Sequence, residues 1–201
     1  MPEAEQLVEQ AVLAAGLRVR YAQPHRHYHT LAHVEHVLHQ ADLLTADFDV
    51  DVLPVRLAAW FHDAVYAPGR DDNEERSAFL ARDTVELIGG APELGREVAR
   101  LVLLTRDHLP PPDDDAGALL SDADLSVLGG SPTEYAAYAA GVRAEFALVP
   151  QDTFRSGRAK VLRRFLDRAE IFHTPAAHKN WESTARTNVE REIVALENGE
   201  S

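Results

Sequence analysis

The sequence of 201 residues predicts an all-α fold, a single-domain helical bundle, and three observations lead to this prediction. Apolar residues recur at the spacing of amphipathic helices. No stretch of useful length alternates with the period of two that marks a half-buried strand. Proline and glycine separate long segments rich in alanine and leucine. A chain of this length can bury one core, so we expect a single domain over residues 1–201.

Proline and glycine set the bounds of the expected helices. Pro24 and the Pro68-Gly69 pair fall in early gaps, the proline run 110–112 falls in the middle, and Pro175 precedes the last helix. These residues interrupt helical hydrogen bonding or favour turns, so helices begin or end near them. The expected helices cover residues 3–16, 29–46, 52–66, 72–88, 93–107, 117–128, 132–147, 152–172 and 176–197.

Composition limits the classes of partner and site. A formal net charge of −13 opposes binding along a nucleic-acid backbone, so a small substrate is favoured over a polymer. The apolar runs are too short to span a membrane and the first residues lack a basic signal-peptide start, so we expect a cytoplasmic protein without a membrane partner. Because there is no cysteine, any metal must be bound by His, Asp or Glu.

His33 is the first candidate metal ligand. On a helix it lies at the edge of an apolar stripe, whereas His29 and His36 lie just outside that stripe. A histidine at this border can pack against the core while its ring reaches a neighbouring helix, although a hydrogen-bonded structural histidine is the alternative. The stripe consists of Leu31, Val34, Val37, Leu38, Ala41 and Leu44.

The His62-Asp63 pair follows a segment, RLAAWF, that is apolar on nearly every side and is therefore expected to be buried. A buried, ionised carboxylate without a partner costs several kcal/mol, so Asp63 needs a cation, a hydrogen bond or a metal. The neighbouring histidine points to a metal. A salt bridge or a His-Asp hydrogen bond is the alternative.

Two further aspartates follow in the segment ALLSDADLSVLGG, and helical phase separates them. Asp124 falls on the inward face with Leu120, Val127 and Leu128, so it is the better ligand. Asp122 points almost the opposite way, and we expect it to be solvated or to lie behind the ligands.

Glu74 falls on the inward face of its helix, in line with Ala78 and Ala81. A carboxylate in that position near a cation can act as a general acid or base. The alternative is an ordinary acidic residue in the first turn of a helix, where the helix dipole favours it.

Five segments in this order resemble the HD superfamily of metal-dependent phosphohydrolases, and in particular a small bacterial branch of predicted phosphohydrolases. The resemblance covers about residues 20–190. The segments are YHTLAHVEHVL, AAWFHDAVY, DNEERSA, LLSDADLSVLG and FRSGRAKVLRRFLDRAEIF.

The resemblance implies a helical bundle of the HD-domain type in which His33, His62, Asp63 and Asp124 bind one divalent ion. Two imidazoles and two carboxylates suit Mn, Fe, Co, Ni or Zn better than Mg. The implied reaction is hydrolysis of a phosphate ester of a small molecule, such as a nucleotide, by metal-activated water that Asp63 also orients. The alternative function is a non-catalytic, metal-containing nucleotide or metabolite sensor. The oligomeric state stays open.

Three residues are candidates for contacts with the substrate. Arg158 lies on the apolar face of its helix, and a guanidinium matches phosphate oxygens bidentately; a pair with a carboxylate is the alternative. His108 continues the inner face of a helix toward its end, where a structural histidine is equally compatible. His29, with Arg26 and Tyr28, is expected at the mouth of the site.

Overall fold

The computed structural model describes residues 2–45, 48 and 50–199, and in this part of the chain every regular element is a helix. The all-α prediction is confirmed. The chain forms two compact units, Met1–Asp124 and Leu125–Ser201. The single domain over residues 1–201 stays a prediction.

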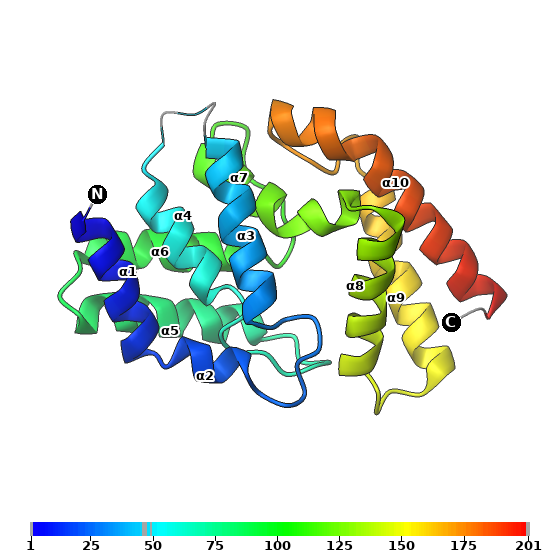
Figure 1. Cartoon of the computed structure of the whole chain (residues 1–201), viewed down its shortest axis with the longest axis horizontal. Helices are drawn as coiled ribbons and strands as arrows, with labels where there is room; N and C mark the ends of the chain where they lie inside the picture. Colours follow the sequence, from blue (N-terminus) through cyan, green and yellow to red (C-terminus); the bar gives the residue numbers. More distant parts are fainter. Residues whose placement is uncertain (1, 46–47, 49, 200–201) are drawn as a thin grey trace. The chain divides into compact units, whose positions relative to one another are not determined.

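The first unit is built around α4, which is buried among its neighbours (Figure 1). This helix contacts α1, α3, α5 and α6, and seven of its ten residues are buried, whereas the side chain of Arg56 is 38% exposed; the expected burial holds for most of the helix but not all round. The helices of this unit are α1 (Pro2–Ala14), α2 (Leu17–Tyr21), α3 (Leu31–Leu44), α4 (Val52–Phe61), α5 (Asn73–Leu87), α6 (Pro92–Leu104) and α7 (Asp115–Leu125), the last of which ends at the boundary between the units.

The short helix α2 was not expected from the sequence. Gly16 has a left-handed backbone, with φ of 60°, and so ends α1 and starts α2 in a new direction. Leu17 and Tyr21 of α2 are buried in the core. The expected helix 29–46 corresponds to α3, but its last expected residue, Ala46, lies outside the described residues.

Helix α4 ends at Phe61, five residues before the predicted end at residue 66. Side chains from another segment bind the carbonyl groups that a longer helix would have used. The Tyr21 hydroxyl donates to the Trp60 carbonyl at 2.9 Å, and the Arg26 guanidinium donates to the carbonyls of Asp63 and Ala64. Tertiary partners thus replace helical hydrogen bonds here, which a local pattern cannot reveal.

The second unit contains η2 (Ser126–Gly129), α8 (Pro132–Glu145), α9 (Gln151–Leu166) and α10 (Pro175–Asn198). Helix α10 packs against α9 and η2. Gly129 permits close packing, because a Cβ atom added there would lie 2.4 Å from Cβ of Trp181. The predicted helix 152–172 ends early, at Leu166, because Arg186 binds the carbonyls of residues 166, 168 and 169.

Among the described helices, none combines the length and the apolar character that crossing a membrane requires.

Candidate metal centre

Three elements of the first unit bring the predicted ligands together. His33 lies in the first turn of α3, His62 and Asp63 directly follow α4, and Asp124 lies near the end of α7. Helices α3 and α4 pack against each other, which places the start of α3 beside the end of α4.

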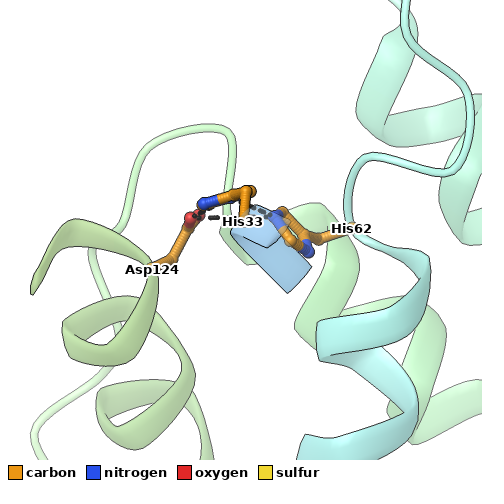
Figure 2. A group of neighbouring side chains, drawn as sticks. All are labelled: His33, His62 and Asp124. Carbon is orange, nitrogen blue, oxygen red and sulfur yellow. Dashed lines mark hydrogen bonds and ion pairs between the residues drawn. The ribbon is translucent and has the colours of Figure 1, made fainter. Parts of the chain in front are cut away.

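His33, His62 and Asp124 form a compact group with the composition of a metal site (Figure 2). Nε2 of His33 lies 3.1 Å from Nε2 of His62 and 3.0 Å from Oδ1 of Asp124. Nε2 of His62 lies 3.6 Å from the same aspartate oxygen. Each residue offers one ligand atom, and these atoms lie within 4.8 Å of one another, so the group could hold a metal ion.

Asp63 borders this group. Its Oδ2 atom lies 3.0 Å from Nε2 of His62 and 3.7 Å from Nε2 of His33. Metal–ligand bonds of about 2.0–2.2 Å place neighbouring donors about 3–3.5 Å apart around one tetrahedral or octahedral ion. The distances among His33, His62 and Asp124 therefore fit binding to a single ion, and Asp63 lies next to this group without being a member of it.

The two imidazoles are buried, with 5% of His33 and 2% of His62 exposed. Nδ1 of His62 lies 2.9 Å from the Ala59 carbonyl oxygen, which can only accept, so Nδ1 carries the proton. This hydrogen bond leaves Nε2 with its lone pair directed at the other ligands. A backbone carbonyl bound to the remote ring nitrogen is the usual way in which proteins orient a metal-binding histidine.

The electrostatics of the group favour a positive charge at its centre. Burial by itself lowers the pKa of His62, but the carboxylates of Asp63 and Asp124 outweigh it and raise that pKa to about 10. Burial likewise opposes ionisation of the two aspartates, yet His62 and the other neighbouring imidazoles hold the pKa of both carboxyl groups well below the usual range. A proton on His62 or a divalent cation would supply this charge.

His29 and His108 lie beside Asp63 and Asp124. Nε2 of His29 is 4.0 Å from Oδ2 of Asp63, and the imidazole packs 4.3 Å from the ring of Tyr66. Nε2 of His108 is 3.6 Å from Oδ2 of Asp124. His108 has φ of 49°, in the left-handed region that a residue with a side chain rarely adopts, and such strain is most common at functional sites. The substrate contacts of His29 and His108 stay predictions.

Asp122 is fully buried, so the expectation of a solvated carboxylate is wrong. It is not a member of the group formed by His33, His62 and Asp124. A position behind the ligands stays the prediction for this residue.

Glu74 lies in the first turn of α5 and is half-buried. Burial raises the pKa of its carboxyl group, and the negative charge of Asp63 raises it further. Nε of Arg106 lies 3.8 Å from Oε2 of Glu74, while the same guanidinium forms an ion pair with Glu75. A carboxyl group with a raised pKa can hold a proton more readily than an exposed one, which is compatible with the predicted acid–base role.

Arg158 lies on α9 of the second unit and binds a carboxylate there. Its Nε and Nη2 atoms donate to Glu192 at 2.8 and 3.2 Å, and the guanidinium lies over the ring of Tyr138 at 4.9 Å. Tyr135 donates to the same carboxylate at 2.6 Å. This is the carboxylate pair that was the alternative for Arg158, and its phosphate contact stays a prediction.

Arg26 is 5% exposed, so the expectation that it lines the mouth of the site is wrong.

The residues that hold the turn after α4 were not identified from the sequence. Ser77 and Asn73 of α5 bind the backbone of Val65 and Ala67 from one side. Both are buried polar residues on the inner face of a helix, and that position was the only available signal.

A scan against protein-family models, a search of curated proteins and a search of solved structures each found no match for this chain.

Proposed function

We propose that this chain is a metal-dependent phosphohydrolase of the HD superfamily that hydrolyses a phosphate ester of a small molecule, such as a nucleotide. The observation that carries the proposal is that the imidazoles of His33 and His62 lie 3.1 Å apart, and that each of the two carboxylates has an oxygen 3.0–3.7 Å from both imidazoles. The ordered sequence motifs supply the reaction class.

The charges of the first unit support a role for a metal ion in binding an anionic substrate. The second unit has equal numbers of acidic and basic residues, so the whole formal charge of −13 lies in the first. Most arginines of the first unit are already paired with carboxylates. A phosphate group therefore needs another source of positive charge, and a divalent ion provides it. The paired arginines are Arg56, Arg70, Arg82, Arg96, Arg100 and Arg106.

In this proposal His33, His62, Asp63 and Asp124 hold the ion. When bound, the ion would lower the pKa of a coordinated water and neutralise charge that develops on a phosphoryl oxygen. Asp63, the most exposed of the four, would also accept a hydrogen bond from the attacking water and so orient it. Glu74 would be the general acid or base that donates or accepts the proton transferred in the reaction.

The test is phosphate release by protein stripped of metal and then reloaded with Mn²⁺, Co²⁺, Ni²⁺, Zn²⁺ or Mg²⁺. We expect no release by the stripped protein and release from some members of a panel of phosphorylated small molecules after reloading, fastest with a transition metal. Calorimetry should show about one ion per chain. If the reloaded protein binds nucleotides but releases no phosphate from any compound, the sensor function replaces the enzyme.

Glu74→Gln should lower kcat about 100-fold and leave the affinity for metal unchanged, because the amide cannot exchange a proton. Steady-state kinetics and metal titration of the same preparation measure the two effects. Glu75→Gln is the matched control, since Glu75 is exposed and forms its ion pair with the same Arg106. Equal activity of Glu74→Gln and wild type would show that Glu74 is an ordinary residue of the first helical turn.

A further inference from the structure

The end of α2 and the segment that follows it bind the backbone at the end of α4 and in the turn after it. Tyr21 donates to the Trp60 carbonyl, and Nε2 of His25 lies 3.0 Å from the Tyr66 carbonyl oxygen. Arg26 follows His25 in the sequence and binds the carbonyls of Asp63 and Ala64, which lie between those of Trp60 and Tyr66. These residues thus contact the turn that carries His62 and Asp63 at several points, from Trp60 to Tyr66.

The Arg26 guanidinium joins two segments that carry metal ligands. Its Nη1 atom donates to the Asp63 carbonyl at 2.8 Å and to the His29 carbonyl at 3.1 Å. Its Nη2 atom donates to the Ala64 carbonyl at 3.3 Å. Asp63 is itself a candidate ligand, and His29 lies four residues before His33, immediately ahead of α3. One planar group therefore fixes the separation between the start of α3 and the turn after α4.

Aromatic rings and a glutamine hold the guanidinium in this orientation. Its carbon atom lies 5.0 Å from the ring centre of Tyr21 and 5.3 Å from that of Tyr66, distances typical of cation–π contacts. Nε donates to the Gln23 side chain at 3.2 Å. A lysine could keep the charge, but its single nitrogen lacks the planar array of donors with which Nη2 and Nε bind Ala64 and Gln23.

We propose that Arg26 is a positioning residue of the metal centre: it sets the geometry of Asp63, His62 and His33 through their backbone without touching the ion. This inference rests on one part of the proposed function, the binding of an ion by His33, His62, Asp63 and Asp124, and not on the reaction. Partners that orient metal ligands in this way typically contribute 10–100-fold to metal affinity. Because Arg26 binds main-chain carbonyls on both sides, its loss should change the ligand geometry as well as the affinity.

The experiment compares Arg26→Lys with wild type in three measurements: the Kd for Zn²⁺ by competition with a chelator, the visible absorption of the Co²⁺-loaded protein, and the denaturant midpoint of the metal-free protein. We expect the Kd to rise 10–100-fold and the Co²⁺ bands to shift. Arg143→Lys is the matched control. Arg143 also donates to carbonyls, those of Phe146 and Val149, and lies over an aromatic ring, but it belongs to the second unit. Its substitution should lower the midpoint and leave both metal measurements unchanged.

A second variant, Gln23→Ala, tests the positioning role even if Arg26→Lys does not fold. Gln23 is exposed and accepts a hydrogen bond from Arg26, so Gln23→Ala should fold normally and raise the Kd about threefold. Wild-type Kd and Co²⁺ bands in both Arg26→Lys and Gln23→Ala would overturn the positioning role, while the metal site and the proposed function would stand. If the wild-type protein bound neither ion, the metal centre itself would be wrong and the inference would fail with it.

Discussion

Asp63→Ala should abolish both metal retention and phosphate release. The substitution removes one of four donors and leaves two imidazoles with a single carboxylate. We expect the Kd for metal to rise by more than about 100-fold, since even partners outside the ligand set contribute 10–100-fold. Turnover should fall by at least about 1,000-fold, because the ion supplies several kcal/mol of charge stabilisation and each 1.36 kcal/mol is tenfold in rate.

Elemental analysis of the purified variant and a phosphate-release assay measure these two effects. Asp42→Ala is the matched control, because Asp42 is an exposed aspartate on α3 that forms an ion pair with Arg56. It should keep both metal and activity. Retained metal and unchanged turnover in Asp63→Ala would show that the His-Asp pair is structural and that the proposed function is wrong.

Arg158→Met should lower the free energy of unfolding by about 3–5 kcal/mol, because it leaves the Glu192 carboxylate in a buried site without its cation. Burial lowers the pKa of Arg158, but Tyr138 and Glu192 outweigh it and raise that pKa, so the guanidinium keeps its charge. Denaturant unfolding monitored by circular dichroism measures the loss.

The double variant Arg158→Met with Glu192→Gln should recover more than half of this loss. The glutamine removes the charge and keeps an acceptor for the Tyr135 hydroxyl, so no buried group is left without a partner. With the Glu192→Gln single variant measured as well, the double-mutant cycle gives the coupling between the two residues. An unchanged free energy of unfolding in Arg158→Met, together with a raised KM, would support the phosphate contact instead.

Local patterns predicted most of the helices and two features of the site. The period of the apolar residues located most ends of α3, α5 and α8 to within about two residues. This is possible because the apolar residues of an amphipathic helix recur on the face that the helix buries. The same phase selected Asp124 over Asp122. The largely apolar segment before His62 predicted the burial of α4, and seven of its ten residues are buried.

The sequence patterns predicted wrong helix ends where side chains distant in the sequence bind the backbone carbonyls. Helix α4 stops at Phe61 because Tyr21 and Arg26 bind the next carbonyls, and α9 stops at Leu166 because Arg186 does the same. Asp122 is fully buried although its helical phase pointed outward. None of these partners lies within the helix that it changes.

The sequence by itself therefore determined the all-α class, the burial of the segment leading to the His-Asp pair and the identity of the residues available to bind a metal. Only the tertiary structure decided that Asp63 and Asp124 each lie 3.0–3.7 Å from the imidazoles of His33 and His62, that Arg26 is buried between the segments that carry these residues and that Arg158 is bound by Glu192. The physical reason is the distance along the sequence over which each effect acts. Helical periodicity and the cost of a buried charge act within one segment, whereas a ligand distance or an ion pair depends on how segments far apart in the sequence pack together.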